Sequence, residues 1–203
     1  MTDRDDQGEL MAGFRRSAGG VTARFARPEA AIIRDLVGQV VELIEPDEAS
    51  PAAAAPAPAR DERDELDNLE AMVGMTDSDD VTSPDDPVLA RLLPDAYRDD
   101  PEAAHEFRRY TESSLRSAKV GCAQTVLATL PTGGGKVRLS SEQAEAWLRS
   151  LNDVRLALGV RLGVTDDFDE RADDVRADDP RFAYVQVYQW LAFIQGSLVE
   201  ALS

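Results

Sequence analysis

Few residues of this 203-residue sequence have types and spacing suited to chemistry. Cys122 is the only cysteine and His105 the only histidine, so the chain can assemble neither a Cys/His zinc site nor an intramolecular disulfide. Cys122 falls among apolar positions of a helical pattern, where a thiol usually behaves as a small inert hydrophobe. His105 lies near the start of the same pattern beside acidic residues. We therefore expect a buried thiol, a surface imidazole, and no catalytic or metal-binding residue.

A glycine-rich stretch, LPTGGGK (130–136), is the nearest approach to a cofactor motif. It is similar to the phosphate loop of certain helicases, in which glycine amides and a lysine hold the phosphates of a nucleotide. However, Val137 stands where the Mg²⁺-binding Ser or Thr is needed, and the stretch follows a helix and precedes a strand, which reverses the required order. We expect a helix-to-strand turn and no cofactor.

Carboxylates are abundant, with 39 acidic against 22 basic residues and a formal net charge of −17. Such a surface disfavours uniform attraction to nucleic acid or to anionic lipid. The acidic run DSDDVTSPDD (77–86) lacks the alternation and the final Glu of an EF-hand loop. No carboxylate falls in the apolar setting that would raise its pKa for acid–base catalysis. The sequence therefore favours neither a cation site nor an enzyme.

One segment is basic. Residues 14–27 contain Arg15, Arg16, Arg24 and Arg27 and no acidic residue. Gly19-Gly20 between two β-compatible runs predicts a hairpin, because both glycines can adopt the positive φ of tight turns. Neighbouring residues of a strand point to opposite faces, so only one of Arg15 and Arg16 can share a surface with Arg24. Two interpretations remain open: a solvated strand face, or a contact with a partner or with DNA.

The remaining elements predict a mainly α (α+β) fold. Apolar residues recur at helical spacing over 28–45, 61–73, 87–93, 101–130, 141–162 and 182–202, and 136–140 reads as a strand that can join the hairpin. Phe107, Leu115, Cys122 and Val126 give the long helix a narrow apolar face. The last helix is apolar on most sides, so we expect it to be buried at the centre.

The expected organisation is a disordered tail (1–13) followed by a single domain (14–203) that contains a flexible Ala/Pro loop (46–60). Asn152 and Arg155 lie three residues apart on the flank of an apolar stripe, which predicts a structural polar seam. No stretch is long and apolar enough to span a bilayer and no secretory signal is visible, so we expect a cytoplasmic protein without membrane contacts.

The motifs RLLPDAY (91–97) and LNDVRLALG (151–159), between a basic start and YVQVYQWLAFIQGSLVEAL, occur in a specific order and spacing. In these the chain resembles an actinomycete family of domains of unknown function that includes oxidative-stress transcriptional regulators of the AosR type. The resemblance implies a mainly helical, cytoplasmic regulator. It supplies no catalytic residues.

Together these observations predict a non-enzymatic transcriptional regulator that acts through a protein partner in the transcription machinery. One alternative is a direct DNA-binding regulator that uses the N-terminal hairpin, or Arg108, Arg109, Arg116 and Lys119 of the long helix; alone, it should bind DNA weakly. Another is a helical interaction module without a regulatory role. A homodimer is compatible with all three.

Overall fold

The fold is described by a computed structural model that covers residues 13–45, 86–97, 100–164, 179 and 181–203. Four expectations lie wholly or largely outside these residues: the tail, the Ala/Pro loop, the short helix at 61–73 and the acidic run 77–86.

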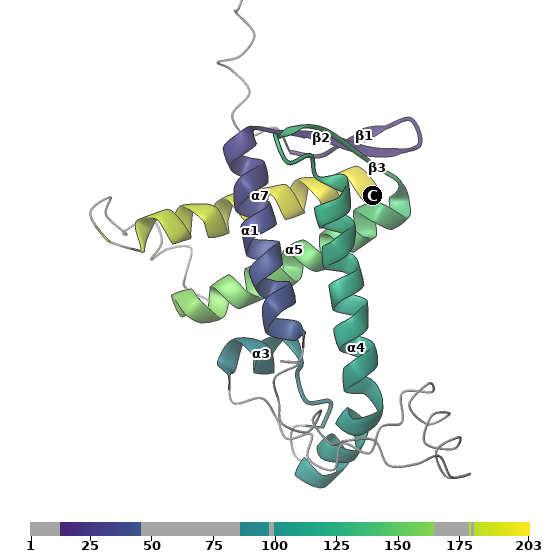
Figure 1. The fold of residues 1–203 in the computed structure, drawn as a ribbon, viewed down its shortest axis with the longest axis vertical. Helices are drawn as coiled ribbons and strands as arrows, with labels where there is room; N and C mark the ends of the chain where they lie inside the picture. Colours follow the sequence, from purple (N-terminus) through teal and green to yellow (C-terminus); the bar gives the residue numbers. More distant parts are fainter. Residues whose placement is uncertain (1–12, 46–85, 98–99, 165–178, 180) are drawn as a thin grey trace, which may run out of the picture.

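Five helices and three strands make up the described part of the chain (Figure 1). In chain order they are β1 (Arg15–Ser17), β2 (Gly20–Phe25), α1 (Arg27–Ile44), α3 (Pro87–Leu92), α4 (Pro101–Thr129), β3 (Gly135–Leu139), α5 (Ser141–Leu162) and α7 (Phe182–Leu202). This confirms the mainly α (α+β) fold, and the small antiparallel sheet forms where the hairpin and the strand near 136–140 were expected. None of the helices in these ranges is long and apolar enough to cross a membrane.

The sheet has the order β1-β2-β3, with both pairs antiparallel, and it lies at one end of the helical body (Figure 1). Gly19 and Gly20 take φ values of +87° and +147°, which residues with a side chain rarely adopt. At Gly20 a Cβ atom would also lie 2.0 Å from the carbonyl oxygen of Leu139. The second glycine is thus required both by the turn and by the close approach of β3.

Several helices begin at residues that satisfy their first free N–H groups. The Asp86 carboxylate accepts from the N–H groups of Val88 and Leu89 at the start of α3. Ser140 and Gln143 form a reciprocal capping box at the start of α5. These caps fix where α3 and α5 begin.

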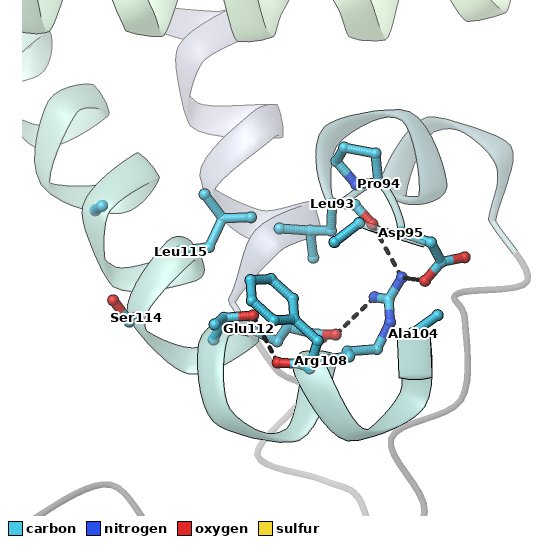
Figure 2. A pocket seen from close by; sticks show the side chains of 12 residues that line it. Leu93, Pro94, Asp95, Ala104, Arg108, Glu112, Ser114 and Leu115 are labelled. Carbon is cyan, nitrogen blue, oxygen red and sulfur yellow. Dashed lines mark hydrogen bonds and ion pairs between the residues drawn. The ribbon is translucent and has the colours of Figure 1, made fainter. Parts of the chain in front are cut away.

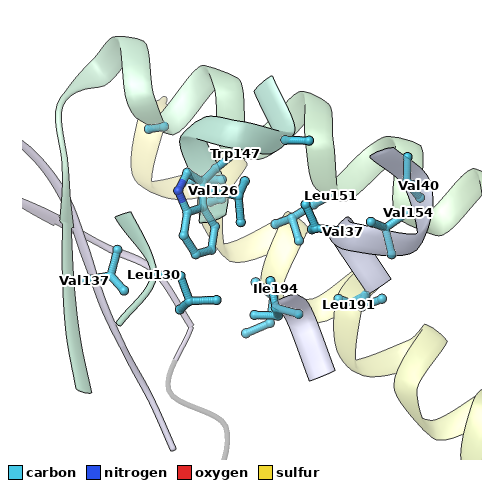
Figure 3. Packing of buried hydrophobic residues seen from close by; sticks show 14 of the residues in the cluster. Val37, Val40, Val126, Leu130, Val137, Trp147, Leu151, Val154, Leu191 and Ile194 are labelled. Atoms are coloured by element: carbon cyan, nitrogen blue, oxygen red, sulfur yellow. The ribbon is translucent and has the colours of Figure 1, made fainter. Parts of the chain in front are cut away.

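The core is centred on α5, which contacts α1, α3, α4, α7 and the sheet (Figure 3). Trp147 of α5 is fully buried, its ring contacts Phe14 and Phe25, and its indole N–H donates to Thr129. Leu151 and Val154 continue the same face of α5 into the core.

The expectation that the last helix is buried on most sides needs correction. One face of α7, with Leu191, Ile194 and Leu198, is buried against the core. On the opposite side Phe193 is 46% exposed, and near the start of the helix Tyr184 is 59% exposed. The apolar character of α7 exceeds what the described part of the fold covers, and the central position belongs to α5.

Helices α1 and α4 run antiparallel, and each provides an arginine to the C-terminal end of the other. Arg34 of α1 donates to the carbonyl oxygens of Leu127 and Leu130 at 2.8 and 3.0 Å. Arg116 of α4 donates to the carbonyl oxygen of Ile44 at 2.5 Å. A cation at a helix C-terminus satisfies free carbonyls and complements the helix dipole, so these contacts stabilise the pair.

Candidate functional site

The exposed face of the sheet gathers four cations from three strands. Along β2, burial alternates: Val21, Ala23 and Phe25 are buried, whereas Arg24 is exposed. Residues directly opposite one another on neighbouring strands point to the same face. Arg15 is opposite Thr22, Thr22 is opposite Arg138, and Arg24 is opposite Lys136. We call the resulting surface the outer basic face; its residues are Arg15, Arg24, Lys136 and Arg138.

The charge of the outer basic face is not balanced locally. The three strands contain no acidic residue. No ion pair to these four cations occurs within the described part of the chain. Like charges directly opposite one another, such as Arg24 and Lys136, destabilise a sheet. The face therefore concentrates positive charge that the described fold does not neutralise, on a protein of net charge −17.

Only part of the predicted basic cluster lies on this face. Arg15 and Arg24 share it, as the alternation along the strands required. Arg16 points to the other side, and its Nε donates to the carbonyl oxygen of Ala201, at the end of α7, at 3.3 Å. Arg27 is the first residue of α1 and is also exposed. Arg15 and Arg24 are therefore the two hairpin arginines that one binding partner can reach together with β3.

Lys136 and Arg138 were not among the predicted site residues. The sequence GKVRL (135–139) could have indicated them, because its charged and apolar residues alternate with the period of a strand and so place both cations on one face. Pairing this strand with β2 places both cations beside those of the hairpin.

Three of the predicted cations of α4, Arg108, Arg116 and Lys119, form ion pairs inside the fold. Arg108 is 7% exposed and lines a hollow of about 360 Å³ that α4 forms with the segment following α3. Figure 2 shows its side chain directed toward Asp95 and Glu112. It donates to Asp95 at 2.5 Å, to Glu112 at 2.7 Å and to the carbonyl oxygen of Leu93 at 3.1 Å. Burial lowers the pKa of Arg108, but its hydrogen bonds and ion pairs with both carboxylates outweigh that effect and leave the pKa above its usual value.

The Arg108 network continues along α4, because Glu112 also accepts from Arg116 at 2.6 Å. Farther along, Lys119 pairs at 2.6 Å with Asp153 of α5, which is almost fully buried. Burial raises the pKa of Asp153, which corrects the expectation that no carboxylate would lie in such a setting. These α4 cations face other helices and structural carboxylates, not a nucleic-acid backbone. They support the association of α4 with its neighbours.

The predicted apolar face of α4 was misplaced in the first half of the helix, where Phe107 and Leu115 are 45% and 39% exposed and Ala104 is buried. In the second half the prediction holds for Val126, which is buried together with Ala123. The buried side of the first half of α4 carries Arg108 and its ion-pair partner Glu112, so hydrophobic spacing alone could not identify it.

Cys122 is half-buried, which corrects the expectation of a core thiol. It lines a hollow of about 500 Å³ between α4, α5 and α7. Leu115 and Val199 lie at this hollow, and so does the Lys119–Asp153 ion pair. The Cys122 side chain is therefore outside the buried cluster that forms the core.

The predicted polar seam divides between two environments. Arg155 reaches α7, where it donates to the Gln195 amide oxygen and its guanidinium lies 5.2 Å from the centre of the Tyr188 ring. Asn152 is exposed and lines the Cys122 hollow together with Gln195. No hydrogen bond joins Asn152 to Arg155 in this part of the structure. Arg155 thus links α5 to α7, while Asn152 faces solvent.

Comparison with known proteins identifies a family whose model matches nearly the whole chain. The model of a family described as "Domain of unknown function (DUF2017)" matches residues 11–202. Relatives named "Oxidative stress regulator AosR", from Mycobacterium tuberculosis and Mycobacterium bovis, are each 39% identical to the chain over 132 residues. These matches cover 59% of this chain and 59% of each relative. No solved structure matches the chain.

Proposed function

The chain belongs to the DUF2017 family, and we propose that it is an oxidative-stress regulator that works in the cytoplasm by binding an acidic protein partner in the transcription machinery through the outer basic face. The regulatory part rests on the names of the mycobacterial relatives, which the resemblance in RLLPDAY and LNDVRLALG also indicated. The binding part rests on a single observation: four exposed cations without ion-pair partners in the described fold, gathered on one face of the sheet.

The distribution of charge favours a protein over DNA as the partner. A protein that depends on the phosphate backbone typically makes about six to ten phosphate contacts. The outer basic face offers four cations, and three candidates on α4 are engaged in ion pairs within the fold. The remaining surface of a −17 protein repels a duplex. An acidic protein surface of limited area matches a small basic face better.

The test begins with capture of the partner from the native lysate and its identification, and continues with the purified pair. The double variant Arg24→Gln/Arg138→Gln removes two charges from the outer basic face. Arg91→Gln/Arg149→Gln removes two exposed charges elsewhere and is the matched control. We expect affinity for the partner to fall about tenfold in the first variant, equivalent to about 1.4 kcal/mol, and to be nearly unchanged in the second.

Equal affinity of the two variants for the partner would show that the outer basic face is only a solvated strand face and does not bind the partner. Tight, sequence-selective binding of duplex DNA by the isolated protein at physiological salt would favour the direct DNA-binding alternative instead. The helical circular dichroism spectrum should be the same for both variants, since neither changes a buried residue.

A further inference from the structure

The hairpin register determines which backbone groups of β3 are free. Ala18 and Gly19 form a two-residue turn, so the flanking residues Ser17 and Gly20 exchange hydrogen bonds as a pair. Hydrogen-bonded and non-hydrogen-bonded pairs alternate along antiparallel strands. Every second residue of β2, counted from Gly20, therefore directs its N–H and C=O toward β1, and the residues between them direct theirs toward β3.

It follows that β3 bonds to β2 through Gly135, Val137 and Leu139. The Thr22 hydroxyl donates to the Val137 carbonyl at 2.8 Å, in agreement with a carbonyl that faces β2. Lys136 and Arg138 consequently direct their N–H and C=O groups away from the sheet. Within the described residues, no hydrogen bond engages these backbone groups.

The opposite edge of the sheet is different. At the start of β1, the Phe14 N–H donates to the Ser197 hydroxyl of α7 at 2.9 Å, and Arg16 reaches the carbonyl oxygen of Ala201. That edge is three residues long and is held against α7. The edge of β3 is thus the one at which the described sheet can accept another strand.

We propose that this edge of β3 receives an extended acidic segment of the protein partner as a fourth strand, antiparallel to β3. The inference rests on the proposed function and specifies how the partner binds. The segment exchanges backbone hydrogen bonds with Lys136 and Arg138, as in other complexes formed by strand addition. Its residues directly opposite these two carry Asp or Glu on the outer basic face, so acidic residues recur at every second position.

The chemistry of the edge selects this occupant over two others. A sheet edge offers donors and acceptors in equal number, whereas a phosphate backbone offers only acceptors and matches half of them. A second copy of this chain, paired antiparallel through β3, would place Lys136 and Arg138 against like charges, which is destabilising. An acidic extended peptide satisfies both the backbone groups and the side chains.

Amide hydrogen exchange, followed by NMR on the full chain, tests the proposal with three synthetic probes. The first is a blocked octapeptide of alternating Glu and Thr. The second is the same peptide N-methylated at each Glu, which removes the donors that face β3 in the proposed pairing. The third is N-methylated at each Thr, which leaves those donors intact and controls for the methyl groups.

In the free protein, the Lys136 and Arg138 amides should exchange fast and the Val137 and Leu139 amides slowly. The first and third peptides should slow exchange at Lys136 and Arg138 at least tenfold. The peptide methylated at Glu should give no protection and bind about tenfold more weakly, because it loses backbone hydrogen bonds to β3.

Equal binding of all three peptides would show that the face attracts acidic chains by charge alone. Strand addition would then be wrong. The proposed function would still be tested separately by the partner affinity of Arg24→Gln/Arg138→Gln. No added protection at millimolar peptide also overturns the inference. Protection of the Lys136 and Arg138 amides in the protein alone also overturns the inference. Protection that rises with protein concentration would show that a second copy pairs with the edge of β3. Protection that does not depend on protein concentration would show that another part of the same chain covers this edge.

Discussion

Replacing Gly20 with Ala should detach β3 from the hairpin and so break up the outer basic face. Gly20 has a φ of +147°, and a Cβ atom there would lie 2.0 Å from the backbone carbonyl oxygen of Leu139. Gly19 provides a matched control, because its φ of +87° is also unfavourable for Ala but a Cβ atom there meets nothing within 4 Å. The two variants separate the conformational cost of the turn from the steric cost of strand pairing.

The magnitudes follow from these two geometries. Positive φ costs a residue with a side chain about 1–2 kcal/mol, and the reduced freedom of the unfolded chain returns about 0.4–1 kcal/mol. Gly19→Ala should therefore cost about 0–1.6 kcal/mol. At Gly20 the Leu139 carbonyl must also retreat by more than about 1 Å to reach ordinary contact, which sacrifices hydrogen bonds between β2 and β3. Gly20→Ala should cost about 3 kcal/mol or more.

Urea unfolding followed by circular dichroism measures both free energies, and amide exchange of Val137 and Leu139 reports on the strand pairing directly. Gly20→Ala should lose protection at these amides and lose affinity for the partner, while Gly19→Ala should retain both. If the two variants are equally stable and equally protected, the close approach of β3 to Gly20 does not constrain the sheet, and the argument for the outer basic face loses its geometric basis.

Two further predictions concern the helices. Leu191→Ala should lower the free energy of unfolding by about 2–5 kcal/mol, because Leu191 is buried in the core. Val199→Ala, at a site 46% exposed, should lower it by about 0.5 kcal/mol or less. Equal losses in urea unfolding would refute the assignment of the two faces of α7. Burial raises the pKa of Asp153, and pairing with Lys119 offsets this only in part, so the Asp153 carboxyl keeps its proton to higher pH in the folded state than in the unfolded state. Between about pH 7 and pH 4, the stability of the wild type relative to Asp153→Asn should therefore rise as pH falls. A relative stability that falls over this window would contradict the direction of the pKa shift.

Local sequence features predicted most of the secondary structure in the described residues. Gly19-Gly20 specified the hairpin, and the spacing of apolar residues specified the long helices. These signals succeeded because each depends on backbone sterics or on hydrogen bonds within a few residues of the chain.

Helix burial was predicted less well. On α4 the apolar period pointed to Phe107 and Leu115, yet the buried side carries Arg108 and Lys119. Charges become buried only where distant partners neutralise them, and Asp95 and Asp153 are brought there by the packing of other elements. Likewise, the apolar composition of α7 did not reveal that α5 would occupy the centre.

For the candidate site, the sequence by itself determined that a basic hairpin exists in an acidic protein and that Arg15 and Arg16 diverge, since alternation along a strand is a property of the backbone. The sequence also indicated that a strand near 136–140 can join the hairpin. Tertiary structure alone decided that this strand pairs with β2, in a register that brings Lys136 and Arg138 beside Arg24, and that Arg16 is directed to the end of α7. Strand order and register between segments more than 100 residues apart depend on how the helices between them pack, and no local pattern encodes that packing.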